Sequence, residues 1–199
     1  MSRPDGHIVI CGYTPSALAA LGELVEEATE VGITLLSMRD VPEMKGVKHL
    51  RLNYLNVEHL RDRRVGLGSC SICVVFAEPT ADAQEARTVD MQTVLAVYNI
   101  KKERPDLPVI VEVADRANTS FIDELECNDV IYKETIDRNL ITSCILHPNI
   151  SPIFYDLLTV RGKQLRRTTS AELGFAESVP YREIRLRGLE LDVTFLGFI

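Results

Sequence analysis

The sequence predicts an α/β fold built on a Rossmann-like, doubly wound parallel sheet. Short apolar runs rich in β-branched residues recur along the first two thirds of the chain, and segments with helical spacing separate them. This alternation is typical of βαβ units with right-handed crossovers, in which helices cover a parallel sheet. A glycine turn also follows the first apolar run. Folds that bind anions at a strand–helix junction share this feature.

Composition limits the classes of protein that the chain can represent. It has 199 residues, 46% of them hydrophobic and 26% charged, which suits one globular domain with an appendage. The net charge of −7 disfavours non-specific binding to nucleic acid, so we expect no nucleic-acid partner. No apolar run approaches the roughly 20 residues of a membrane span. Five cysteines, an odd number, indicate reduced thiols, and together these features predict a cytoplasmic protein.

The first strand and its helix are the clearest elements. Ile8–Ile10 are apolar and β-branched, Gly12 interrupts the run, and Pro15 suits the first turn of a helix. Residues 17–24 are rich in helix formers. A strand, a glycine turn and a helix together direct free N–H groups and a positive helix end toward a phosphate or another anion.

The other sheet elements follow in order, with Asn56 expected to cap the second helix and Pro105 to end the third. The segment CSICVVFA is the most apolar strand and is predicted to lie centrally, buried on both faces. Further strands are predicted at residues 33–36, 47–52, 70–77, 107–113 and 130–132, and helices at residues 56–65, 82–102 and 117–126.

Beyond the sheet the pattern changes to two apolar helices, at residues 134–146 and 151–160, separated by His147-Pro148. They carry more apolar side chains than helices lying free on a surface would, so we expect them to pack against a second chain. Residues 161–169 read as a linker, and 181–186 and 191–199 as strands. The apolar side chains of the two helices are Ile141, Ile145, Leu146, Ile150, Ile153, Phe154, Leu157 and Leu158.

Three segments, HIVICGYTPSALAAL, VIVEVADRAN and ETIDRNLITSCILHPNISPIFYDLL, resemble the RCK or KTN (TrkA N-terminal type) domains that regulate potassium channels and transporters. The resemblance implies a Rossmann-like RCK N-lobe (residues 6–133), a crossover helix–turn–helix dimerisation arm (134–160) and a partial or truncated C-terminal lobe (161–199). It also implies a homodimer joined through the arm, and a larger ring such as an octamer.

The function implied by this resemblance is that of a cytosolic, non-enzymatic sensor. It would control the gating of a K⁺ channel pore or transporter membrane subunit at the inner face of the membrane. Two alternatives stay open: an NAD(P)-dependent oxidoreductase on the same fold, and a structural ring subunit whose pocket binds nothing.

The candidate cofactor residues lie at the carboxyl ends of the strands, where such sheets bind ligands. A dinucleotide fingerprint would need glycine at Thr14 and Ala17, and Thr14 is expected to intrude on the phosphate. Three interpretations stay open: a purely structural turn, binding of a smaller anion or mononucleotide, and tighter binding of NAD. We expect any adenine nucleotide to bind weakly. Arg39 stands near the usual place of a ribose-binding carboxylate, and its guanidinium would suit a phosphate. The alternative is that Arg39 is simply solvated in its loop. The candidates are Gly12, Tyr13, Thr14, Pro15, Ser16, Arg39, Asp40 and Asn53.

A second candidate site is a cluster of carboxylates that would suit Ca²⁺. Calcium-gated members of the resembling family carry one carboxylate after the fourth strand and two, at i and i+2, at the end of the fifth. Glu112 matches the first of that pair, but Ala114 takes the second position. The alternative to a calcium site is that these carboxylates are solvated in their loops and that Asp82 caps the start of a helix. The candidate metal ligands are Glu112, Asp115, Asp82 and Glu78.

Three further patterns are interpreted as structural. Cys70 and Cys73 have CxxC spacing without a second pair, so we expect them to pack in or beside the buried strand. Tyr98 and Lys102 have the spacing of short-chain dehydrogenases but sit late in a helix, and His147 reads as a helix-end residue.

Overall fold

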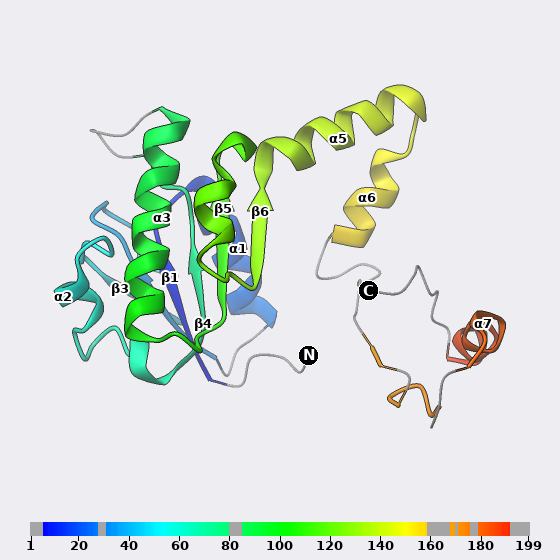
Figure 1. Cartoon of the computed structure of the whole chain (residues 1–199), viewed down its shortest axis with the longest axis horizontal. Helices are drawn as coiled ribbons and strands as arrows, with labels where there is room; N and C mark the ends of the chain where they lie inside the picture. The colour runs from blue at the N-terminus through cyan, green and yellow to red at the C-terminus, as the bar shows by residue number, and fades with distance from the viewer. Residues whose placement is uncertain are drawn as a thin grey trace. The chain divides into compact units, whose positions relative to one another are not determined.

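Six parallel strands form one sheet in the order β3-β2-β1-β4-β5-β6, which confirms the predicted fold class (Figure 1). Strand β1 lies between β2 and β4, so the strand order reverses there. The carboxyl ends of these strands are the general position of the ligand crevice in open α/β sheets. The strands are β1 (His7–Cys11), β2 (Gly32–Leu36), β3 (Val47–Leu50), β4 (Cys70–Val75), β5 (Val109–Val113) and β6 (Asp129–Tyr132).

This computed structural model describes residues 6–27, 31–79, 85–158, 168–169, 171–175 and 179–191. The chain divides into two compact units, residues 2–156 and, together with Met1, residues 157–199. In the described ranges no helix combines the length and the apolar character needed to cross a membrane.

The helices between the strands are shorter than predicted in two places. Asn56 caps the second helix as expected, since its Oδ1 accepts a hydrogen bond from the Glu58 N–H at 2.9 Å, but this helix ends at Leu60. Beyond it, Asp62 accepts a hydrogen bond from the Arg64 N–H at 2.8 Å, and this local turn competes with helix. The third helix ends before Pro105 as predicted.

The fourth predicted helix, at residues 117–126, is instead a 3₁₀ turn followed by one helical turn, and Glu126 has a positive φ of 50° that ends regular structure. The start predicted for the third helix, at Asp82, lies outside the described residues. The elements are α1 (Pro15–Glu27), α2 (Val57–Leu60), η1 (Leu67–Ser69), α3 (Ala86–Glu103), η2 (Arg116–Asn118) and α4 (Ser120–Asp123).

The two faces of the sheet are covered unequally. On one face, α2 and α3 pack over all the central strands, and the side chains of Cys73 and Val75 are fully buried. On the other face, α1 packs over β1 and β2, while Ile72 and Val74 of β4 are only half-buried. The prediction that β4 is buried on both faces is therefore wrong, because Ile72 and Val74 pack only partly buried against the core beneath α1.

The helical arm begins directly after β6 (Figure 1). Helix α5 (Lys133–Leu146) and helix α6 (Ser151–Leu158) are separated at His147–Ile150, as predicted from Pro148. Neither helix contains a buried residue. The side chain of Ile145 is 74% exposed and that of Leu146 is 67% exposed, so the apolar surface of the arm has no cover within this chain's described residues.

The predicted strand at residues 181–186 is wrong, because the segment is a helix, α7 (Tyr181–Glu190). Ile184 and Gly188 are its buried residues, and their spacing of four positions is that of one helical face. The strand predicted at 191–199 and the linker at 161–169 lie largely outside the described residues.

Candidate functional site

The crevice is built around the Gly12 turn. Gly12 has φ = 93°, and a Cβ at this position would lie only 2.8 Å from the Phe76 carbonyl oxygen and 3.3 Å from the Glu78 Cβ. Its N–H donates to the Leu36 carbonyl at 2.9 Å. Glycine is required here because the chain leaving β4 passes against the end of β1. The ends of β1, β2 and β4 are thereby held together.

The start of α1 is capped by Thr14. Its Oγ1 accepts a hydrogen bond from the Ala17 N–H at 3.0 Å, and the residue is buried. The intrusion of Thr14 on a phosphate stays a prediction; in this structure its hydroxyl turns back onto the helix. Lys133, at the start of α5, donates to the Ser16 Oγ at 3.2 Å. This places a positive charge beside the α1 N-terminus, where an anion is favoured.

Glu78 connects the loops at the end of the sheet. Its Oε1 accepts a hydrogen bond from the Ser37 hydroxyl at 2.9 Å, and its Oε2 accepts one from the Tyr54 hydroxyl at 3.2 Å. The Arg39 Nε lies 3.1 Å from Oε1 and forms an ion pair. Arg39 also donates to the Pro79 carbonyl oxygen through Nη2. The carboxylate of Glu78 therefore has a cation and two hydroxyl donors around it.

Burial makes these interactions strong. The Glu78 side chain is 4% exposed, whereas that of Arg39 is 49% exposed, so the arginine reaches from the surface into the crevice. Charges removed from water are stable only with close partners. Burial, and next the charge of Glu78, raise the pKa of Tyr54 far above its usual value. Tyr54 thus stays protonated at neutral pH and can donate to the carboxylate.

The remaining cofactor candidates lie around this cluster with other partners. The carboxylate of Asp40 is fully solvated and pairs with the exposed Arg51 at 3.0 Å. The Asn53 Oδ1 accepts from the Leu55 N–H at 2.9 Å, which closes a local turn. Tyr13 packs partly buried against the α1-side core, and Pro15 begins α1.

Sequence reasoning missed three members of the site: Ser37, Tyr54 and Lys133. The first two stand beside the predicted Arg39 and Asn53, in loops that a parallel sheet brings to one edge. That general rule could have signalled them, although nothing local marks which residue of each loop turns inward.

The candidate metal ligands are not gathered into one cluster. Asp115 caps η2 by accepting from the Ala117 N–H at 2.9 Å, and Asp82 lies outside the described residues. Glu112 is half-buried on β5. Burial raises the pKa of the Glu112 carboxyl, while the charge of Lys133 opposes this effect. Across the described ranges, no three His, Cys, Asp or Glu side chains lie close enough to hold a metal ion. The calcium site stays a prediction.

Another buried carboxylate, that of Asp90 on α3, has a structural role that the sequence did not reveal. It accepts hydrogen bonds from the Ala114 N–H at 2.7 Å, the Asp115 N–H at 3.0 Å and the Asn118 Nδ2 at 2.7 Å. Asp90 therefore fixes the loop after β5 to α3.

The two CxxC cysteines are buried in β4, as predicted. Burial raises the pKa of Cys70 to about 12, and a hydrogen bond with Cys11, together with burial, raises the pKa of Cys73. Thiols in this state are poor nucleophiles. Tyr98 lies half-exposed on α3, distant in sequence from the crevice loops.

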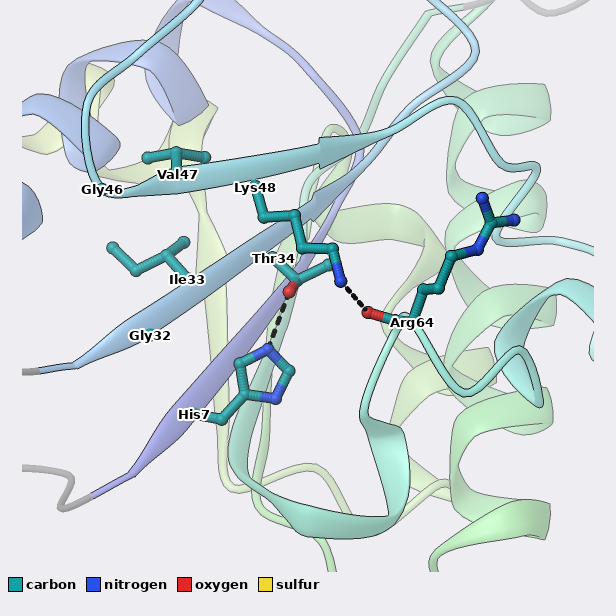
Figure 2. A pocket seen from close by; sticks show the side chains of 8 residues that line it. All are labelled: His7, Gly32, Ile33, Thr34, Gly46, Val47, Lys48 and Arg64. Carbon is teal, nitrogen blue, oxygen red and sulfur yellow. Dashed lines mark hydrogen bonds between the residues drawn. The ribbon is translucent and has the colours of Figure 1, made fainter.

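A separate shallow pocket lies at the opposite, amino-terminal edge of the strands (Figure 2). Its His7 Nε2 lies 2.8 Å from the Thr34 Oγ1, and Lys48 donates to the Arg64 carbonyl oxygen at 2.9 Å. The Arg64 guanidinium pairs with Asp62 at 2.7 Å. These polar groups are therefore already paired with one another.

Residues 53–111 match the family described as the calcium-activated potassium channel slowpoke-like RCK domain. No curated protein matches the sequence. Among solved structures, the human SLO3 gating ring shares 16% identity at a TM-score of 0.61, over 84% of this chain and 31% of that chain.

Two other structures agree with this comparison. The TrkA-N domain of the Escherichia coli inner membrane protein ybaL shares 18% identity at a TM-score of 0.54, over 71% of this chain and 98% of that domain. The GsuK channel bound to NAD shares 14% identity at a TM-score of 0.59, over 76% of this chain and 25% of that chain. This chain thus spans a third or less of the two channel proteins. Over residues 53–111 the sequence is similar to the slowpoke-like RCK domain, and the fold is similar to those of the SLO3 gating ring, the GsuK channel and the ybaL TrkA-N domain.

Proposed function

We propose that this chain is a ligand-sensing regulatory domain that controls the gating of a potassium channel or transporter. The match to a slowpoke-like RCK family and the likeness to gating-ring folds support this class. The observation that carries the proposal is the apolar arm, in which α5 and α6 contain no buried residue. An exposed apolar surface of this kind requires a partner.

The arm and the sheet offer complementary unpaired surfaces. Ile110 of β5 pairs in register with Val74, and Glu112 pairs with Ile131 of β6, so all four face the same side as α1. Ile131 is 43% exposed. In a homodimer, the arm of one chain can pack on the partner, an isologous contact that closes. We assign residues 6–133 to the lobe, 134–160 to this arm and 161–199 to a partial or truncated C-terminal lobe.

A second apolar stripe supports assembly beyond a dimer. Met91, Leu95 and Tyr98 recur at helical spacing on α3, each between 44% and 51% exposed. Because α3 packs on the opposite face of the sheet from Ile131, a contact here leaves the arm free. Two independent contacts per chain would generate a ring such as an octamer.

The crevice is the proposed ligand site, and an adenine nucleotide is the proposed ligand class. GsuK has structures bound to NAD and to ADP, and a Shewanella denitrificans Kef C-terminal domain has one in an AMP-bound form. In this chain the Gly12–Ser16 turn, Arg39 and Lys133 would receive the phosphate. The effect on gating can be no larger than the difference in ligand affinity between the two states of the ring.

A regulatory role fits the chemistry of the crevice better than an oxidoreductase does. Its buried carboxylate is already paired with a guanidinium and two hydroxyls, which is an arrangement for binding rather than for proton transfer. We place the domain on the cytoplasmic side of the membrane, where it would pull on the pore or transporter subunit.

Oligomeric state tests the proposal directly. We expect the chain to be at least a dimer by light scattering, and expect Phe154→Asp with Leu158→Asp to give monomers whose lobe keeps its circular dichroism. Leu189→Asp, at an exposed leucine of α7, is the matched control and should not dissociate the dimer. A wild-type chain that stays monomeric at tens of micromolar would contradict the proposal.

Ligand class needs its own measurement. Calorimetry with ATP, ADP, NAD⁺ and NADH should show weak binding that Arg39→Gln reduces, and nanomolar affinity for NADH would show the crevice to be a true dinucleotide site. For calcium, Glu112→Gln should abolish any Ca²⁺-dependent rise in melting temperature. An unchanged rise would place the ion elsewhere.

A further inference from the structure

The side chain of Glu78 lies where a ligand of such a sheet is expected. Glu78 follows β4, and its Cβ lies 3.3 Å from the place of a Cβ on Gly12, at the end of β1. Its carboxylate then reaches Ser37 beyond β2 and Tyr54 beyond β3. The side chain thus crosses the carboxyl ends of neighbouring strands at the point where the strand order reverses, which is the general ligand position of open α/β sheets.

We propose that Glu78 is an internal competitor for the phosphate of the ligand. Its carboxylate occupies the anion position of the crevice and neutralises Arg39, so a phosphate-bearing ligand binds only when it displaces this carboxylate. The inference rests on the proposed function of the crevice as a nucleotide site, and it names the residue that sets the affinity of that site.

The donors around Glu78 are those that a phosphate would use. A guanidinium Nε–H and two hydroxyl groups converge on the two carboxylate oxygens at 2.9–3.2 Å. Charge-assisted hydrogen bonds of this kind suit carboxylate and phosphate oxygens alike. A phosphate that approached with Glu78 in place would meet a like charge and an arginine that is already paired.

The carboxylate also has the advantage of being tethered. Because Glu78 belongs to the same chain, it competes at a high effective concentration, whereas a free ligand must bind from solution. Arg39 is half-exposed, so it can exchange one anion for another without unfolding of the loop. These two facts explain why the crevice would bind nucleotides weakly although its Gly12 turn and helix N-terminus are intact.

A purely structural role for Glu78 predicts a different result. In that case the carboxylate only satisfies the buried hydroxyl of Tyr54, and its removal would lower stability without any gain in ligand affinity. Glu78→Gln separates the two roles. Its amide oxygen, at the place of Oε1, still accepts the hydrogen bond from Ser37, and its NH2 group can donate to the Tyr54 hydroxyl oxygen at the place of Oε2, but the neutral amide no longer neutralises Arg39.

The experiment is calorimetric titration of the full chain with AMP and with inorganic phosphate. We expect Glu78→Gln to bind both about tenfold more tightly than wild type, and the gain to disappear in the double variant with Arg39→Gln. Glu103→Gln is the matched control, because it removes the carboxylate of a different arginine pair, Arg61–Glu103, at 2.9 Å. It should leave both affinities unchanged.

Each outcome decides a separate question. Equal AMP affinity in wild type and Glu78→Gln would overturn the role of Glu78 while leaving nucleotide sensing intact. Binding of AMP and phosphate by Glu78→Gln alone would support the role of Glu78 and reject nucleotide sensing by the wild-type chain. Absence of binding in both would overturn the inference. If Glu78→Gln does not fold, Tyr54→Phe, which removes one donor to Glu78, should give a smaller gain, and no gain would overturn the inference.

Discussion

The two faces of the sheet differ in how completely this chain covers them. On the face of α2 and α3, residues from β1, β4 and β5 join one core in which Val9, Val75 and Val111 are fully buried. On the α1 face, the core ends near β1 and β2, and the outer strands leave Ile131 43% exposed. Both faces are equally apolar in sequence along β4, where Ile72 and Val74 alternate with Cys73 and Val75.

The difference teaches that apolar composition on both faces of a strand does not by itself show that both faces are buried within the single chain. Parallel strands carry apolar side chains on both faces because both are normally covered. Here the chain after β6 continues into the arm (Figure 1), and the core on the α1 face includes no residue of β5 or β6. The uncovered half therefore fits the proposed contact with a second copy.

The largest effect is expected on the covered face. Ile100→Ala on α3 removes a fully buried side chain and should lower the free energy of unfolding by about 2–4 kcal/mol, because the cavity cannot be filled by neighbours. Urea denaturation would measure the loss. A loss below about 1 kcal/mol would break the comparison, since it would mean that this face is no better packed than the other.

A matched substitution on the uncovered face should lower the stability of the lobe by a smaller amount. Ile131→Ala removes a side chain that is partly exposed in the single chain. In the monomeric Phe154→Asp/Leu158→Asp variant, we expect this substitution to lower the free energy of unfolding by about 0.5–1 kcal/mol. In the chain with its natural arm, the same change should also weaken self-association. Sedimentation at several concentrations would measure this effect, and unchanged association would remove Ile131 from the contact.

His7 provides a pH test at the amino edge of the covered face (Figure 2). Burial lowers the pKa of His7 from 6.5, which the hydrogen bond with Gly66 partly offsets. The unfolded chain therefore binds the proton more readily, and stability should fall as pH drops through about 6.5. We expect His7→Gln to flatten the decline in melting temperature between about pH 7 and pH 5.5. An identical decline in both proteins would contradict this prediction.

The smallest change in stability is expected from the titration of Glu112 on the uncovered face. Burial raises the pKa of its carboxyl above 4.5, so the folded chain holds this proton more tightly than the unfolded chain. This contribution to stability is present below the unfolded pKa and is lost as pH rises through the folded one. Glu112→Gln should remove that small slope in thermal melts above pH 4.5. In a dimer, cover from a partner would deepen burial and enlarge the slope, so the monomeric variant is the informative comparison.

The sequence by itself determined the features that depend on neighbours along the chain. Pro15 and the helix formers after it predict α1, Asn56 predicts a cap, and Pro148 predicts the break between α5 and α6. These signals act within one turn or one strand, so they can be read without knowing what lies across the sheet. The apolar alternation between strands and helices likewise predicts a parallel sheet.

Only the tertiary structure decided which side chains meet and which surfaces stay open. Ser37, Tyr54 and Glu78 come from three loops. The sheet order β3-β2-β1-β4 brings the hydroxyls of Ser37 and Tyr54 to the carboxylate of Glu78. The sequence placed Glu78 among metal ligands because a carboxylate after a strand has the same local pattern in either role. Its partner is chosen by register and strand order, which depend on contacts between residues far apart in the chain, so no local pattern encodes it.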